Sequence, residues 1–231
     1  MKYFLYLLLF SSLINCKNKV PQAQNDTPKQ VGSNTYLALG DSYTIGESVA
    51  EADRWPVQLV RELKDKNISV DNPKIIAKTG WTTDELKAAI VSQNISQKYD
   101  LVSLLIGVNN QYRGRNMEEF KVEFEDLLNT AIAFSRNGES NVFVVSIPDW
   151  GVSPFAAGRD VNKIGKEIDA YNAASKVICD KYGIIYIDIT DISRETQSGF
   201  FASDGLHPSG KMYAAWVNKI VSEVLKFKLN D

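Results

Sequence analysis

The sequence YLALGDS, residues 36–42, is a short apolar run that ends abruptly in glycine, aspartate and serine. Its apolar residues are continuous rather than alternating, which is typical of a parallel strand covered by helices on both faces. Four further runs of this kind follow, at residues 74–77, 101–106, 142–147 and 184–187. The sequence therefore predicts a mostly parallel sheet of about five strands.

Amphipathic stretches of helical length separate these runs and predict the layers that cover the sheet. They lie at residues 55–66, 83–96, 117–136, 163–182 and 209–227. The last of them carries apolar residues at helical spacing, namely Met212, Trp216, Ile220 and Val224. We therefore expect Trp216 to pack in the core. The alternation of strands and helices predicts an α/β fold, a three-layer α/β/α sandwich in one domain over residues 35–231.

The N-terminus has the features of an export signal. Lys2 precedes an apolar run, residues 3–10, that is too short to span a bilayer as a permanent helix. The sequence LINC at residues 13–16 resembles a bacterial lipobox, whose cysteine is lipidated and becomes the mature N-terminus. We therefore predict an export signal over residues 1–16 with a lipid anchor on Cys16. The alternative is a plain secretory signal with an incidental cysteine.

Residues 17–34 are polar and rich in Gln, Asn, Pro and Lys, a composition typical of a flexible tether. We predict an exported lipoprotein anchored to a membrane, in the periplasm or on the surface of a bacterium. The remaining cysteine, Cys179, lies in a helical stretch with no adjacent base. We expect it to be a small buried hydrophobe rather than a nucleophile or a disulfide partner.

Composition excludes several classes of function. The 231 residues include 26 basic and 28 acidic ones, with a formal net charge of -2 and no basic stripe, so a nucleic-acid partner has no support. A zinc site needs more nitrogen or sulfur ligands than one histidine provides. We therefore expect no metal and no cofactor, and the sequence carries no indication of oligomeric state.

The one histidine, His207, stands in the run DGLHP, residues 204–208. Asp204 precedes it across a short turn that contains glycine, so the carboxylate can reach the imidazole ring and fix its tautomer. With Ser42 at the end of the first predicted strand, these residues make the serine, histidine and acid that nucleophilic acyl transfer needs. Asp188 or Asp191 are the alternative acids, in which case Asp204 is a turn residue.

Polar segments follow other predicted strands as well. The sequence KTGW, residues 78–81, comes after the second strand, and GVNN, residues 107–110, comes after the third. In open α/β sheets, ligands bind beyond the carboxyl ends of the strands. We therefore expect these segments, Ser42 and His207 to converge at one edge of the sheet.

Taken together, these segments resemble the SGNH hydrolases, also called GDSL esterases or lipases. The family blocks occur in order as Gly40-Asp41-Ser42, Gly80, Gly107-Val108-Asn109 and Asp204-Gly205-Leu206-His207, and the resemblance covers residues 35–225. It implies a flavodoxin-like topology and an ester hydrolase. Tyr43 stands where many members have leucine, and Asn110 stands where many members have aspartate.

The resemblance also implies a role for each matched residue. Ser42 is expected to be the nucleophile, His207 its base and Asp204 the acid that orients the base. The oxyanion hole is expected to consist of the backbone N–H groups of Ser42 and Gly80 and the side-chain amide of Asn109. Asp41 is expected to be a turn or cap residue.

The loops after the second, third and fourth strands carry further candidates for a substrate pocket, namely Trp81, Tyr112, Arg113, Trp150 and Phe155. Ordinary packing explains each of them equally well. The stretch PDWGVSPF, residues 148–155, is long, aromatic and punctuated by proline and glycine. We predict that it is a specificity loop, because binding residues concentrate on loops held by a rigid scaffold.

These features predict a serine ester hydrolase that cleaves carboxylic esters through an acyl-enzyme on Ser42. The expected substrates are small-acyl esters of carbohydrates or envelope polymers, or lysophospholipids. The alternative is a catalytically silent, surface-anchored lipoprotein that binds carbohydrate or lipid on the same fold. A standard α/β-hydrolase is disfavoured, because no Gly-x-Ser-x-Gly sequence occurs.

Overall fold

The computed structural model describes residue 1 and residues 32–195, 197–227 and 229. The predicted lipid anchor, Cys16, and the rest of the predicted export signal after Met1 lie outside the described residues, as does most of the predicted tether. Asn34, the last residue of that tether, is buried, and its backbone N–H donates to the Ser69 carbonyl at 2.9 Å. In the described part of the chain, no helix combines the length and the apolar character that crossing a membrane requires.

Five parallel strands form the sheet, in the order β2-β1-β3-β4-β5. They are β1 (Tyr36–Gly40), β2 (Lys74–Ala77), β3 (Leu101–Leu105), β4 (Val142–Val145) and β5 (Ile185–Ile187). The strands β1, β3 and β4 are buried along their whole length, which explains why their sequences are continuously apolar. The predicted parallel sheet is confirmed.

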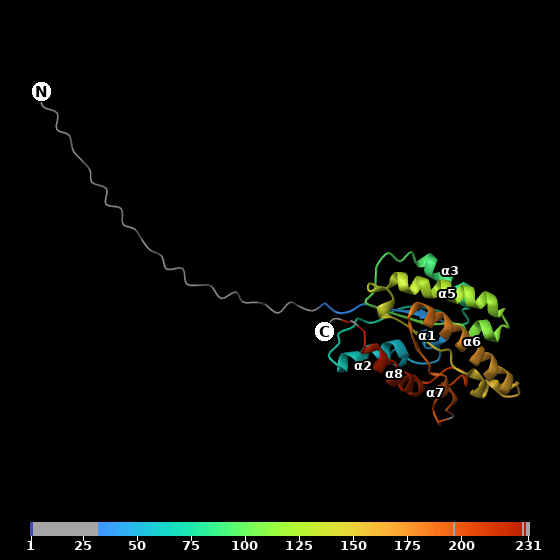
Figure 1. The fold of residues 1–231 in the computed structure, drawn as a ribbon. Coiled ribbons are helices and arrows are strands. Elements are labelled where there is room, and N and C mark those ends of the chain that lie inside the picture. The colour runs from blue at the N-terminus through green and yellow to red at the C-terminus, as the bar shows by residue number, and fades with distance from the viewer. Residues whose placement is uncertain (2–31, 196, 228, 230–231) are drawn as a thin grey trace. The chain divides into compact units, whose positions relative to one another are not determined.

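Two layers of helices cover the sheet (Figure 1). On one face α2 (Trp55–Asp65) packs against α8 (Gly210–Val224), and on the other lie α3 (Thr83–Gln93), α5 (Met117–Phe134) and α6 (Val161–Tyr182). Trp216 is fully buried on α8, where it packs as expected from the helical spacing. The three-layer α/β/α sandwich is confirmed.

Three single-turn helices that the sequence did not predict follow β1, β3 and β5. They are α1 (Ser42–Ile45) after β1, α4 (Val108–Tyr112) after β3 and α7 (Thr190–Arg194) after β5. A helix this short has no room for a periodic apolar pattern, so the sequence gives no signal for it. These helices matter for function because α1 and α4 hold Ser42 and Asn109 just beyond the carboxyl ends of two adjacent strands.

Candidate active site

Ser42 is the first residue of α1 and follows β1 after a one-residue turn. The turn depends on Gly40, because a Cβ at this position would lie 2.2 Å from Thr44 Oγ1 and 2.4 Å from the Leu105 carbonyl oxygen. No other residue fits such a close approach of helix and neighbouring strand. The glycine of the Gly-Asp-Ser segment therefore permits the sharp turn that presents the serine.

Asp41 is completely buried beside the serine and caps α1. Its Oδ1 accepts the backbone N–H of Tyr43 at 3.0 Å, and its Oδ2 lies 3.5 Å from Asn109 Nδ2. Burial raises the pKa of Asp41 to about 7, because the cost of removing the charge from water outweighs the hydrogen bonds that favour it. Asp41 is therefore a cap residue, as expected, and it links the serine turn to Asn109.

His207 and Asp204 form a direct side-chain pair. His207 Nδ1 lies 2.7 Å from Asp204 Oδ2, while Asp204 Oδ1 accepts the backbone N–H groups of Leu206 and His207 at 2.9 and 3.0 Å. The carboxylate thus orients the imidazole and fixes the turn that carries it. The alternative acids, Asp188 and Asp191, form no hydrogen bond or ion pair with His207 in the described part of the chain.

Ser48 adds a second side-chain donor to Asp204. Its Oγ donates to Asp204 Oδ2 at 2.6 Å, the same oxygen that faces His207. Burial opposes ionisation of Asp204, but hydrogen bonds from Ser48, His207 and the backbone lower its pKa well below the usual range. Ser48 has a backbone φ of 63°, a left-handed conformation that residues other than glycine rarely adopt. No sequence signal indicates Ser48, because it lies 156 positions from Asp204.

Gly80 and Asn109 approach the same edge of the sheet from the ends of β2 and β3. Gly80 has a φ of 86°, which favours glycine, and its carbonyl accepts a hydrogen bond from the Arg113 guanidinium. Asn109 Nδ2 donates to the Trp81 carbonyl at 3.0 Å. Within the described residues, the backbone N–H groups of Ser42 and Gly80 have no protein acceptor, so both are available to an oxygen of a ligand.

One open cavity of about 190 Å³ brings these segments together. Its lining includes Ser42, Gly80, Asn109 and His207. Asp204 lies outside the lining and is connected to it by its hydrogen bond to His207. No hydrogen bond joins Ser42 Oγ to His207 among the described residues. Their side chains border the same space, and such bonds often tighten only when substrate is bound.

The other predicted pocket residues divide into two groups. Tyr112, Trp150 and Phe155 line the cavity, whereas Trp81 and Arg113 lie outside its lining. Residues not singled out from the sequence complete the lining, namely Tyr43, Thr79, Val108 and Leu206. In the part of the chain that the structure describes, no cluster of three or more His, Cys, Asp or Glu side chains is placed to hold a metal ion.

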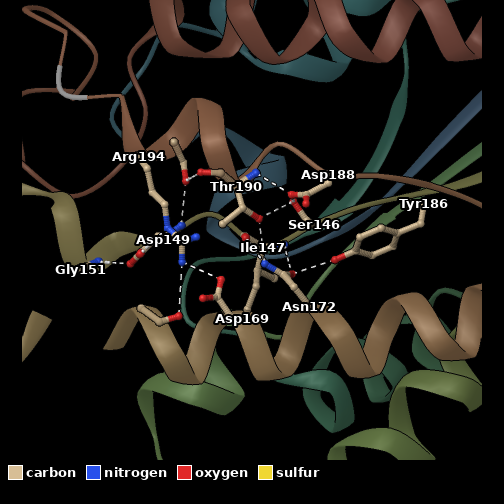
Figure 2. A network of polar contacts seen from close by, with 12 residues as sticks. Ser146, Ile147, Asp149, Gly151, Asp169, Asn172, Tyr186, Asp188, Thr190 and Arg194 are labelled. Carbon is tan, nitrogen blue, oxygen red and sulfur yellow. Dashed lines mark hydrogen bonds and ion pairs between the residues drawn. The ribbon is translucent and has the colours of Figure 1, made fainter. Parts of the chain in front are cut away.

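A buried polar network anchors the loop that carries Trp150 (Figure 2). Asp149 Oδ2 accepts from Arg194 Nε on α7 at 2.9 Å. Asn172 on α6 accepts the backbone N–H of Ile147 at 2.9 Å and donates to its carbonyl at 3.0 Å. Two helices therefore hold the start of this loop, and Trp150 is presented to the cavity on a rigid support.

Comparison with known proteins supports the same fold. The model of the GDSL-like lipase/acylhydrolase family matches residues 38–215, which confirms the resemblance seen in the sequence. The crystal structure of TesA superposes with a TM-score of 0.65 at 18% identity, covering 83% of this chain and 98% of that one. No curated protein matches the chain by sequence.

Two further solved structures share the architecture. The psychrotrophic esterase EstA from Pseudoalteromonas sp. has a TM-score of 0.63 at 16% identity, covering 84% of this chain and 98% of that one. A catalytic mutant of Axe2, an acetylxylan esterase from Geobacillus stearothermophilus, has a TM-score of 0.64 at 19% identity, covering 85% and 96%. Identities this low show the fold alone.

Proposed function

The chain belongs to the GDSL-like lipase/acylhydrolase family, and we propose that it hydrolyses carboxylic esters through an acyl-enzyme on Ser42. The observation that carries this proposal is the 2.7 Å contact between His207 Nδ1 and Asp204 Oδ2. It leaves the other ring nitrogen free to act as a base in the cavity that Ser42 also lines. Nucleophile, base and orienting acid are thus all available at one place.

The proposed reaction has two steps. His207 Nε2 takes the proton of Ser42 as Oγ attacks the ester carbonyl carbon, and Asp204 stabilises the imidazolium that forms. The carbonyl oxygen becomes an oxyanion that accepts hydrogen bonds from the N–H groups of Ser42 and Gly80. It also accepts from the Asn109 amide N–H that otherwise makes only the long, 3.5 Å contact with Asp41. His207 then returns the proton to the departing alcohol. A water molecule, activated by the same histidine, releases the acid and restores the serine.

We further propose that the acyl group is short, with acetyl as the preferred one. A cavity of about 190 Å³ is smaller than the pockets that hold drug-sized ligands, and Val108 and Leu206 are among its apolar lining residues. The aromatic rings along the cavity suit the apolar faces of a sugar on the alcohol half. Axe2, one of the structural neighbours, is an acetylxylan esterase, so an acetylated carbohydrate has a precedent as a substrate on this fold.

The test of the hydrolase proposal compares wild type with Ser42→Ala on p-nitrophenyl acetate, butyrate and octanoate. We expect wild type to favour acetate, and Ser42→Ala to lose about 10⁴-fold or more in kcat on every ester. Ser92→Ala is the matched control, since Ser92 is an exposed serine on α3 outside the cavity lining. A preference for octanoate would refute the short acyl group alone, whereas an inert wild type would favour the ligand-binding alternative.

We also propose that the protein is exported and held to a membrane by a lipid on Cys16. The sequence resemblance of residues 13–16 to a lipobox supports this location. Cys16→Ser should move the protein from the detergent phase to the aqueous phase in a phase-partition assay. Equal partition of both proteins would leave the plain secretory signal as the better interpretation.

A further inference from the structure

A positive charge lies beside the aromatic side of the cavity, on the exposed Arg159, which contacts the lining rings but is outside the lining itself and forms no ion pair with an acidic residue in the described part of the chain. The guanidinium carbon of Arg159 lies 5.4, 5.2 and 5.1 Å from the ring centroids of Tyr112, Trp150 and Phe155, the three rings that line the cavity. Among the described residues Arg159 forms no ion pair, and its side chain makes one long hydrogen bond, from Nη2 to the Tyr112 hydroxyl at 3.4 Å. Most of its N–H donors are therefore unused.

The ring contacts leave hydrogen-bond donors of the guanidinium available to a ligand. Aromatic rings attract the positive charge but do not satisfy the guanidinium N–H groups. The guanidinium fork matches a carboxylate, which accepts two parallel hydrogen bonds from it. Since three rings already hold the side chain, binding an anion costs less conformational entropy than it would for a free arginine.

The alcohol half of the ester is expected to begin next to His207. His207 gives its proton to the departing alcohol, so the alcohol oxygen has to sit beside the imidazole. The backbone N–H of Phe155 donates to the Gly205 carbonyl at 2.9 Å, which fastens the aromatic loop to the turn that carries His207. A substrate that extends from His207 along this loop would therefore approach Phe155 and the Arg159 guanidinium beside its ring.

We propose that Arg159 determines specificity by binding a carboxylate on the alcohol half of the ester, as an acetylated uronic acid would present it. Tyr112 and Phe155 remain 48% and 41% exposed, so their rings can also pack against a sugar. This inference rests on the proposed ester hydrolase function. It adds to that function a charged group on the substrate and the residue that recognises it.

The experiment uses the full chain and two matched substrates, a methyl glucoside and a methyl glucuronoside acetylated on the same hydroxyl. The readout is the ratio of kcat/KM for the glucuronoside to that for the glucoside. We expect a ratio of about ten for wild type, and a fall to about one for Arg159→Gln, the change expected when one charge-assisted hydrogen-bonding group is lost. Added NaCl should lower the wild-type ratio, since screening weakens charge recognition but not ring packing.

Arg61→Gln is the matched control, because Arg61 is an exposed arginine on α2 that contacts none of the three rings, and it should keep the wild-type ratio. A wild-type ratio near one, a ratio unchanged in Arg159→Gln, or a ratio insensitive to salt would each overturn the proposal. In each of these cases, hydrolysis of p-nitrophenyl acetate by wild type would still support the proposed esterase function. If wild type hydrolysed that ester but neither sugar, the carbohydrate assignment and the role of Arg159 would be wrong together.

Discussion

The two sides of the cavity are held by different forces. On the side of His207, short hydrogen bonds converge on Asp204, at 2.7 Å from the imidazole and 2.6 Å from Ser48. On the aromatic side, Tyr112 and Trp150 meet with ring centroids 5.3 Å apart. Hydrogen bonds fix both distance and angle, whereas ring contacts are favourable over a range of separations and tilts.

Because the two sides are held by different forces, they are suited to different tasks. Proton transfer between Ser42 and His207 requires a fixed geometry, because a small displacement of the reacting groups lowers the rate for every substrate. Holding the alcohol half requires contact area and charge, and a ring that shifts slightly still provides both. Substitutions on the histidine side should therefore change kcat for all esters, and substitutions on the aromatic side should change which ester is preferred.

Among the substitutions that test the separation of the two sides, the largest effect is expected for Asp204→Asn. The amide keeps the size of the carboxylate but cannot stabilise the imidazolium and can favour the wrong tautomer of His207, so kcat should fall about 10³-fold or more. The loss should be the same for the acetylated glucoside and the acetylated glucuronoside, whose leaving alcohols need the same proton from His207. Asp191→Asn serves as the control, since Asp191 is exposed on α7. A loss that depended strongly on the alcohol would contradict the separation of the two sides.

Much of the histidine side could be predicted from the sequence because its residues obey local rules. Asp204 and His207 lie within one turn, and Ser42 directly follows a buried strand, so each is placed by its neighbours in the chain. The expected convergence of the segments then follows from the parallel sheet. Ser48 could not be predicted, because no local rule connects it to Asp204. Its hydrogen bond to Asp204 forms only once α1 and the loop that carries Asp204 and His207 are folded.

The aromatic side was predicted less well for a related reason. Five residues were predicted from their position after a strand, and of these Tyr112, Trp150 and Phe155 line the cavity whereas Trp81 and Arg113 do not. Position after a strand places the backbone near the site but does not orient a side chain in a loop. Arg159 could not be predicted, because its contacts with Tyr112 on α4 and with two rings of its own segment between β4 and α6 depend on tertiary folding and leave no mark in the spacing of residues.

A smaller effect is expected for the two variants of Ser48, which separate its hydroxyl from its backbone. Ser48→Ala removes the hydroxyl and keeps the left-handed strain, whereas Ser48→Gly removes both. We expect about a tenfold loss of kcat in each, since the lost bond was donated to a charged acceptor. Thermal unfolding should show Ser48→Gly to be the more stable variant, by about 1 kcal/mol.

The pH dependence of unfolding gives a second test of Ser48. Hydrogen bonds depress the pKa of Asp204 in the folded state. They therefore stabilise the fold at pH values above the pKa of the unfolded carboxyl, about 4. This stabilisation is lost as the pH falls through the folded pKa. Ser48→Ala should therefore be less stable than wild type at neutral pH, and the difference should shrink in acid. Full activity in Ser48→Gly with a loss in Ser48→Ala would show that the backbone conformation mattered and the hydroxyl did not.

The smallest effect is expected for Phe155→Ala, which removes one ring from the aromatic side. Since the ring is 41% exposed and contributes one stacking contact, KM for an acetylated sugar should rise about threefold while kcat stays near the wild-type value. The link from this loop to the histidine turn is the backbone bond from Phe155 to Gly205, which the substitution retains. A fall in kcat as large as that of the Ser48 variants would mean that the ring itself holds His207 in place, and the two sides of the cavity would then be one mechanical unit.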